Sequence, residues 1–466
     1  MSEPRGLVDS ASHRLRLSPA SAHTVVALVV AFLIPLVHGT AQDFVYDAAQ
    51  YWGGATALVS GHSPVAAGGL TTRGVYTAIV YSPPAIVASL IGPGAAAWAV
   101  LVWNAALGSA VSVILLPRIA GLFASDTLSL PPLVRMWTSA LLGGVLLSGF
   151  ARYPLVDMWA AALALAGFYG LAVGRRWWSL SLAGVLLSVA ANLRPATIAP
   201  IALSVLILLI VRAKPISISL PGAALAISGQ LVFNLAVWHL WSLVPRETGP
   251  LSAVQAGPAT YTLRYDTVPF SGQDPRQWFC DPAYATMLVD DRIASNQLDV
   301  IMSAFRHLPD SLWFLFRKAA ANLEWGGATP YGDSTNPASN PLAILVITVS
   351  AAGVVALVLH AVKNRSRKRS FVVTLAILGF WFGALGTLVF STPETRFALP
   401  LVLVGLVGIL AAIPARVRLA LPQSRAVVAL LCGIALTVTV LVAGAQAVGD
   451  RMPPGPLAGA ADCAAQ

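Results

Sequence analysis

Two carboxylates near the start of the chain have the type and spacing of an acid–base pair. They lie in the stretch Asp43-Phe-Val-Tyr46-Asp47-Ala-Ala-Gln-Tyr-Trp52. If this stretch is helical, Asp43 and Asp47 are one turn apart on one face. Like charges at that spacing raise the proton affinity of one carboxylate, which makes it a better base near neutral pH. The alternative is an amphipathic helix at a membrane surface with two solvated acids.

Three arginines stand near prolines at the predicted starts of helices. The three sequences are Arg152-Tyr-Pro154, Arg194-Pro195 and Pro393-Glu394-Thr395-Arg396. Proline suits the first turn of a helix, so the prolines are explained as start signals. A cation in the first turn opposes the helix dipole unless an anion is close, so Arg396 indicates an anion site. Arginine binds phosphate through paired hydrogen bonds, although snorkelling to the membrane surface also explains each arginine.

Polar residues inside the predicted membrane helices need partners. Asp157 lies in the first turn of one such helix, and we expect it to form an ion pair with Arg152 rather than to act in catalysis. Gln230 and Asn234 are one turn apart in another helix, and Asn104 lies in the middle of a third. Hydrogen bonding between helices is the expected role of these three amides.

The elements that must position these residues are membrane helices. Of the 466 residues, 57% are hydrophobic and 10% are charged, whereas soluble domains have about 25% charged residues. Apolar stretches long enough to cross a hydrocarbon core of about 30 Å recur along the chain. We expect spans at 22–39, 95–117, 136–150, 154–173, 177–191, 196–212, 218–243, 340–362, 371–390, 397–413 and 424–446. The predicted fold is an all-α polytopic membrane protein with about eleven transmembrane helices.

The distribution of charge predicts the orientation of these spans. With a cytoplasmic N-terminus, the inside segments hold more than half of the 29 basic residues, but only Glu3, Asp9 and Asp126 of the 19 acidic ones. The positive-inside rule then fits every short loop. The net charge of +10 therefore indicates topology rather than a nucleic-acid partner. A cleaved signal peptide from Arg14 to Gln42 is the competing interpretation, and the many downstream spans make a retained helix simpler.

This orientation divides the chain into five parts. They are a cytoplasmic N-terminus (1–21), a transmembrane module (22–243) whose first outer loop is 40–94, an extracytoplasmic loop domain (244–339), a second transmembrane module (340–446) and an extracytoplasmic tail (447–466).

Three features of the outer segments carry further expectations. The segment 298–315 has the apolar spacing of a small cap or an interfacial helix. The segment 79–91 contains Pro83 and Pro84, is too short to span, and is expected to dip into the interface. Cys280 and Cys463 both fall outside, where an oxidising compartment permits a disulfide, and the sequence has no metal-type cysteine or histidine spacing.

The order of four sequences resembles the GT-C glycosyltransferases, which are polytopic membrane enzymes that use polyprenyl-phosphate sugars. The four are Asp43 to Trp52, Val80-Tyr81-Ser82-Pro83-Pro84, Asn192-Leu193-Arg194-Pro195, and Pro393 to Pro400. Within that class the chain is most similar to bacterial relatives of the protein mannosyltransferases and to actinobacterial mannosyl- and arabinofuranosyl-transferases.

The resemblance implies an inverting transfer of mannose or arabinofuranose from a polyprenyl-phosphate donor to an envelope glycan, glycolipid or protein. The reaction would take place on the outer face of the plasma membrane. No cofactor is expected, and metal dependence is not indicated, because the acids of the outer segments lack a recognisable ligand spacing. Asp43 would be the base, with Asp47 second, and Arg194, Arg396 and Arg152 would bind the donor phosphate. The supporting residues would be Tyr46, Tyr81, Asp157 and Glu394. The first outer loop lacks the adjacent Asp-Glu pair common in protein mannosyltransferases, which leaves the base and the acceptor open.

Two other classes of protein have a similar composition. One is a transporter or flippase of a lipid-linked envelope precursor, and the other is a non-catalytic scaffold subunit. Transporters place their sites near the bilayer midplane, whereas the charged residues here gather at the predicted outer rim. That location favours an enzyme acting at the membrane surface.

Overall fold

The computed structural model describes residues 19–41, 43–62, 74–123, 131–246, 259, 261–266, 276–290, 297–323, 330–331, 341–412, 421–447, 450–451 and 463. Most of the predicted cytoplasmic N-terminus (1–21) lies outside the described residues. So do parts of the outer loop 40–94, of the loop domain 244–339 and of the tail 447–466.

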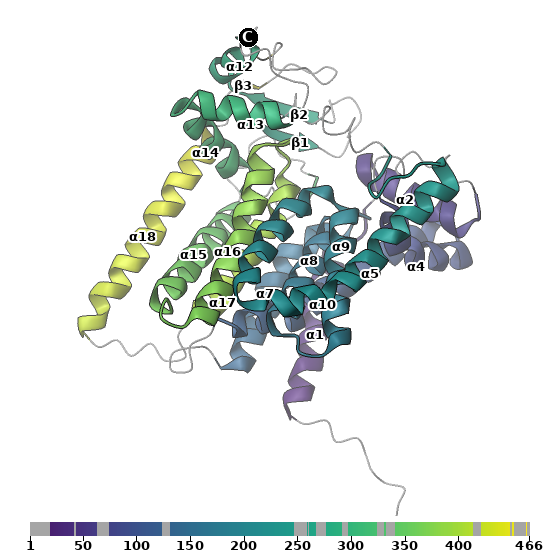
Figure 1. Cartoon of the computed structure of the whole chain (residues 1–466), viewed down its shortest axis with the longest axis horizontal. Coiled ribbons are helices and arrows are strands. Elements are labelled where there is room, and N and C mark those ends of the chain that lie inside the picture. Colours follow the sequence, from purple (N-terminus) through teal and green to yellow (C-terminus); the bar gives the residue numbers. More distant parts are fainter. Residues whose placement is uncertain are drawn as a thin grey trace, which may run out of the picture.

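The described chain is mostly helical, as predicted (Figure 1). The helices of its bundle are α1 (Pro19–Val37), α2 (Tyr46–Val59), α4 (Val75–Ile91), α5 (Ala96–Ala110), α6 (Leu116–Gly121), α7 (Pro132–Ala151), α8 (Asp157–Val173), α9 (Trp177–Leu193), α10 (Ile198–Trp238), α15 (Pro341–Lys363), α16 (Lys368–Val389), α17 (Leu399–Ala412) and α18 (Leu421–Gln446).

Six helices in the described ranges are long and apolar enough to cross a membrane. They are Pro93–Gly121, Pro132–Ala151, Pro195–Trp238, Leu342–Lys363, Lys368–Val389 and Thr395–Ala412. The other predicted spans lie on shorter apolar helices or on one of the two arms of α10. A membrane protein is therefore supported, and the count of about eleven spans stays a prediction.

The long helix α10 is two helices joined at a sharp bend. Arg212 has non-helical dihedral angles (φ −134°, ψ 28°), close to the end of the predicted span 196–212. Its guanidinium turns back to the C-terminal end of α8, where Nε donates to the Leu171 carbonyl at 2.8 Å and Nη2 donates to the Gly174 carbonyl. A cation suits a helix C-terminus, whose last carbonyls lack helical partners. Arg212 therefore fixes the bend against α8.

Helix α4 begins earlier than predicted and runs through both prolines. It starts at Val75, whereas we expected only a short interfacial segment over 79–91. Pro84 has no N–H for the Val80 carbonyl, and the Trp103 Nε1 donates to that carbonyl instead, at 3.0 Å. The side chain of a neighbouring helix thus satisfies a group that the proline frees, as membrane helices require.

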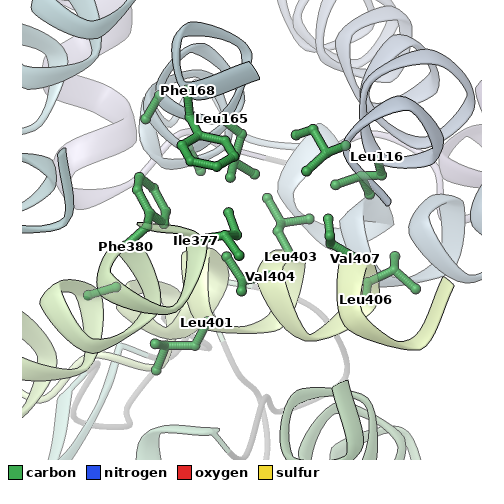
Figure 2. Packing of buried hydrophobic residues seen from close by; sticks show 14 of the residues in the cluster. Leu116, Leu165, Phe168, Ile377, Phe380, Leu401, Leu403, Val404, Leu406 and Val407 are labelled. Atoms are coloured by element: carbon green, nitrogen blue, oxygen red, sulfur yellow. The ribbon is translucent and has the colours of Figure 1, made fainter. Parts of the chain in front are cut away.

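The core of the bundle lies where α8, α16 and α17 meet (Figure 2). Phe168 of α8 and Phe380 of α16 are almost fully buried, together with Leu403 and Leu406 of α17. α15 and α17 approach closely at glycines, because a Cβ on Gly353 would collide with the backbone of Gly405. Contacts between small residues of this kind bring membrane helices together where no hydrophobic effect drives them.

A small mixed structure covers one end of the bundle (Figure 1). It contains β1 (Tyr261–Asp266), β2 (Arg276–Cys280), β3 (Asp450–Arg451), α12 (Pro282–Asp290), α13 (Gln297–Arg306) and α14 (Asp310–Leu323). The three strands form one antiparallel sheet in the order β1-β2-β3. We call this structure the cap, and the end of the bundle on which it lies the cap end.

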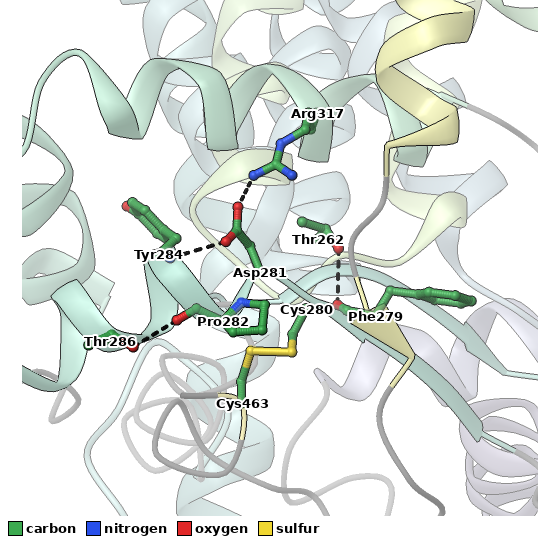
Figure 3. Close-up of a disulfide and its surroundings, with 9 residues drawn as sticks. All are labelled: Thr262, Phe279, Cys280, Asp281, Pro282, Tyr284, Thr286, Arg317 and Cys463. Carbon is green, nitrogen blue, oxygen red and sulfur yellow. Dashed lines mark hydrogen bonds and ion pairs between the residues drawn. A yellow bond between two sulfur atoms is a disulfide. The ribbon is translucent and has the colours of Figure 1, made fainter. Parts of the chain in front are cut away.

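The cap is joined to the end of the chain by the disulfide that the sequence permits. Cys280 at the end of β2 bonds to Cys463 (Figure 3). The next residue, Asp281, accepts a hydrogen bond from the Tyr284 N–H at the start of α12 and pairs with Arg317 of α14. Tyr284 in turn stacks on Phe314 with ring centroids 3.9 Å apart. One aspartate thus links the disulfide, α12 and α14.

Candidate functional site

The centre of the candidate site is an arginine held between two carboxylates. Arg396 lies in the short 3₁₀ turn Thr395–Ala398 that leads into α17, and 5% of its side chain is exposed. Its Nε donates to Glu394 Oε2 at 2.5 Å, and its Nη2 donates to Asp47 Oδ2 at 2.5 Å. The anion that the sequence requires beside Arg396 is therefore supplied by the protein itself.

The two predicted carboxylates of the first outer loop have different surroundings. Asp47 lies in the first turn of α2, where the helix dipole favours a negative charge. Asp43 lies before α2 and is exposed, and within the described ranges it has no hydrogen-bond or ion-pair partner. The helical face that we expected the two residues to share does not form. Tyr46 has a left-handed φ of 51°, which prevents the helix from extending toward Asp43.

Asp157 pairs with Arg194, and not with Arg152 as predicted. Arg194 follows the last residue of α9, and its guanidinium carbon lies over the Phe397 ring, 3.9 Å from the ring centroid. The guanidinium of Arg396 is 5.6 Å from the same ring. Two of the three predicted phosphate ligands thus meet on one aromatic ring.

Arg152, the third predicted phosphate ligand, follows the last residue of α7, and its side chain binds a backbone carbonyl. Its Nη2 donates to the Thr40 carbonyl at 3.2 Å. Its buried Nε has no hydrogen-bond partner among the described residues, and the same is true of Nη1 of Arg396. Unsatisfied buried guanidinium N–H groups are rare because they lose their water without compensation. Both arginines can therefore donate one more hydrogen bond.

A network around Asn104 fixes the turn that carries Arg152 and Asp157. The Asn104 Nδ2 donates to the carbonyls of Ala151 and Tyr153 at 3.3 and 2.8 Å. Tyr81 is fully buried, and its hydroxyl donates to the Leu155 carbonyl at 2.6 Å. Tyr81, predicted as a supporting residue, therefore acts on the α7–α8 turn and does not reach the charged groups through these bonds.

Of the other two predicted amides, Gln230 connects helices, as expected, whereas Asn234 bonds to Gln230 in its own helix and to the carbonyls of Ser242 and Val244 after that helix. Gln230 Oε1 accepts from the Val75 N–H at 2.9 Å and from Asn192 Nδ2 at 3.1 Å. Gln230 Nε2 donates to Asn234 Oδ1 at 2.8 Å. These bonds join α4, α9 and α10 near the start of α4.

Tyr331 is a site residue that the sequence did not reveal. It is 2% exposed, its hydroxyl donates to the Val45 carbonyl at 3.4 Å, and its ring contacts those of Tyr46 and Tyr153. The signal was weak, a single aromatic residue between Pro330 and Gly332. Tyr331 brings a part of the 244–339 segment next to the first outer loop.

Lys318 of α14 connects the cap to the segment that carries Glu394 and Arg396. Its Nζ donates to the carbonyls of Ala259 and Ser391 at 2.6 and 2.8 Å. The side chain is completely buried, and this burial lowers the pKa of the amino group well below its usual value. Ser391 is three residues before Glu394, so the hydrogen bond helps to fix the turn that presents Glu394 and Arg396.

Two cavities lie on different sides of the start of α10. A cavity of about 20 Å³, enough for one water molecule, is lined by Asp157, Arg194 and Arg396. A larger one of about 370 Å³ lies between α9 and the two arms of α10. Its walls are mainly apolar, and Pro195, next to Arg194, lines it. Its size is within the usual range for small-molecule pockets.

The described residues contain no group of three or more His, Cys, Asp or Glu side chains that could hold a metal ion. No family model matches the chain, and no curated protein matches it. The function of the site must therefore be inferred from its own residues and geometry.

Proposed function

We propose that the chain is a membrane glycosyltransferase. It would move mannose or arabinofuranose from a polyprenyl-phosphate donor to an envelope glycan, glycolipid or protein on the outer face of the plasma membrane. One observation carries the proposal: carboxylates and arginines from distant parts of the chain meet at the cap end, and the exposed Asp43 lies four residues before one of them, Asp47. The meeting groups are Asp47, Glu394, Asp157, Arg194 and Arg396.

Asp43 is the proposed base. Its carboxylate is exposed, whereas Asp47 is tied to Arg396. Asp43 would accept the proton of the acceptor hydroxyl while that oxygen attacks the anomeric carbon. The bond from the anomeric carbon to the phosphate oxygen then breaks, polyprenyl phosphate leaves with the electron pair, and the configuration inverts.

Charge balance limits how the donor phosphate can bind. The cluster has three carboxylates for two guanidinium groups, so an added phosphate is repelled unless one carboxylate releases its arginine. Asp47 is the most exposed of the three carboxylates, at 22%, compared with 10% for Glu394 and 3% for Asp157. Moving the Asp47 carboxylate from Arg396 into water therefore costs less free energy than moving either of the other two carboxylates. Asp47 and the donor phosphate would compete for Arg396, with the unpaired N–H groups of Arg396 and Arg152 as additional donors.

The larger cavity would receive the lipid chain of the donor. It is mainly apolar, lies between helices α9 and α10, and is bordered by Pro195, the neighbour of Arg194. A phosphate at Arg194 would therefore be close to an apolar space of about 370 Å³.

The experiment is a transfer assay with purified protein in lipid, with radiolabelled polyprenyl-phosphate mannose or arabinofuranose and an envelope-lipid extract. Asp43→Asn should reduce kcat by about 10²-fold or more. Asp47→Asn should lower KM for the donor and change kcat little, because it removes one of the two carboxylates that pair with Arg396. Asp310→Asn, an exposed acid of the cap, is the matched control.

The outcomes separate the parts of the proposal. Unchanged transfer by Asp43→Asn would assign the base to another residue. A raised KM in Asp47→Asn would argue against competition for Arg396. If the wild-type protein transfers neither sugar, the transferase proposal loses its support.

The second candidate, a carrier of a lipid-linked precursor, is favoured by the larger cavity, which lies among membrane helices. Movement of a labelled lipid across vesicles, with no transfer of its sugar, would favour the carrier. A scaffold subunit would show neither activity.

A further inference from the structure

The cap carries an apolar ridge that the described residues leave uncovered. Its members are large apolar side chains with exposed fractions between 48% and 64%. The apolar ridge consists of Leu298, Met302, Phe305, Leu308, Leu312 and Trp313. Three of them recur along α13 at helical spacing, so they lie on one face. The other faces of α13 and α14 are packed inside the cap, where Val300, Ala304 and Phe314 are buried.

The apolar ridge continues the surface of α18, the helix that holds the predicted span 424–446. Trp313 stacks on Phe316 with ring centroids 5.6 Å apart, and Phe316 contacts Gly444 near the cap end of α18. Leu436 and Val440 precede Gly444 at intervals of four residues, so the three share one face of α18. Leu436 and Val440 are 67% and 46% exposed, as expected of side chains that face lipid. One apolar strip therefore runs from the side of α18 onto the cap. Figure 1 shows α18 rising to α14.

The level of the ridge matches a membrane surface. Helix α18 has 26 residues, which at 1.5 Å per residue is about 39 Å, longer than the hydrocarbon core of about 30 Å. The last turns of α18, with Phe316 and Trp313 beside them, can therefore reach the headgroups, where tryptophan is enriched. Arg306 is exposed next to Phe305, and this pairing of apolar and basic side chains suits a helix in the plane of the interface.

We propose that the apolar ridge of α13 and α14 lies in the outer leaflet of the bilayer and anchors the cap to the membrane surface. The occupant of this face is lipid, because the ridge is continuous with the lipid-facing strip of α18. The anchor holds α14 at a constant depth relative to the membrane surface. Lys318 of α14 donates to the Ser391 carbonyl, so the anchor also positions the segment that contains Ser391. This inference does not depend on the proposed transferase activity.

The test measures where the ridge lies relative to lipid. In a Cys432→Ser background, which removes the free cysteine, Met302→Cys and Leu312→Cys each receive an environment-sensitive fluorophore in the full-length protein. Ala283→Cys, an exposed position on α12 away from the ridge, is the matched control. The proteins are reconstituted in vesicles that contain nitroxide-labelled lipid, and iodide serves as the aqueous quencher.

Labels on the ridge should emit at shorter wavelength than the control label. They should also be quenched by the nitroxide lipid at least about threefold more strongly than the control. Quenching by iodide as strong as at position 283 would place the ridge in water and overturn the proposal. Protection from both quenchers, together with cross-linking of the ridge cysteines to a second protein, would also overturn it, because the occupant would then be protein. An intact Cys280–Cys463 disulfide in each variant, measured by mass spectrometry, verifies that the cap is folded.

Discussion

The ion pair between Asp47 and Arg396 joins residues separated by 349 positions in the sequence, so its loss should destabilise the fold of the whole chain. Arg396→Gln leaves Asp47 and Glu394 without their cation. Removing one partner of a buried ion pair destabilises by about 3–5 kcal/mol, and we expect this range. Asp47→Asn leaves Glu394 to compensate Arg396 and should destabilise by about 2 kcal/mol.

The interaction between the two residues can be estimated separately. Two unit charges about 4 Å apart attract by about 4 kcal/mol at an effective dielectric constant of 20. The Asp47 side chain is 22% exposed and is partly screened by water, which reduces the expected coupling to about 2 kcal/mol. Asp47→Asn should then have almost no effect in the Arg396→Gln background.

The assay is reversible unfolding by SDS in bicelles, applied as a double-mutant cycle. Arg365→Gln is the matched control, because Arg365 is exposed and has no ion-pair partner among the described residues. It should change the free energy of unfolding by less than about 0.5 kcal/mol. If the effects of Asp47→Asn and Arg396→Gln add to within about 0.5 kcal/mol, the two side chains do not interact and the proposed centre of the site is wrong.

Three further predictions use the same unfolding measurement. Arg194→Gln should destabilise the protein by about 3 kcal/mol because it leaves buried Asp157 unpaired. Arg152→Gln should destabilise it by only about 1 kcal/mol, because it removes one hydrogen bond to a carbonyl. Equal effects of the two variants would contradict the pairing of Asp157 with Arg194. The stability of the wild type should rise with pH from the lowered pKa of Lys318 up to the usual 10.5, because there the unfolded chain holds a proton that the folded chain has released. Lys318→Met should flatten this slope, and an unchanged slope would refute the assignment. Cys463→Ser should destabilise the cap by about 2–4 kcal/mol. Amide hydrogen exchange should become faster in β2 and stay unchanged in α17. Unchanged exchange in β2 would show that the disulfide does not stabilise the cap.

The sequence was sufficient for features that depend on local composition. Apolar runs predicted the helices, and amides inside them predicted contacts between helices, because a polar group in lipid must find a partner. The contacts of Gln230 and Asn104 follow from this rule, whereas Asn234 bonds within α10 and to the segment after it. The identity of each partner does not follow from it, since any carbonyl or amide at the same depth would serve.

The pairing of Asp157 shows where local reasoning fails. Arg152 is five residues away, which made it the natural candidate, but it ends α7 and turns to the Thr40 carbonyl. Arg194 is distant in sequence and becomes the neighbour only because α8 and α9 pack side by side and return the chain to the same end. Tyr331 and the start of α2 were missed for a related reason, since tertiary contacts and one left-handed residue decide them.

The charge balance of the site could not be read from the sequence either, and it changes the meaning of the arginines. An arginine at a helix start suggested a vacant anion site, yet Arg396 and Arg194 are both already paired with carboxylates. Such pairs keep the guanidinium groups in fixed orientations before any ligand binds, and they oppose a ligand that brings more negative charge. A phosphate bound as we propose would displace a carboxylate, and Asp47, the most exposed of the three, is the one we expect to leave. In the proposed transferase, Asp47 would thus hold Arg396 when no donor is bound and release it to the donor phosphate, a role separate from that of the exposed Asp43.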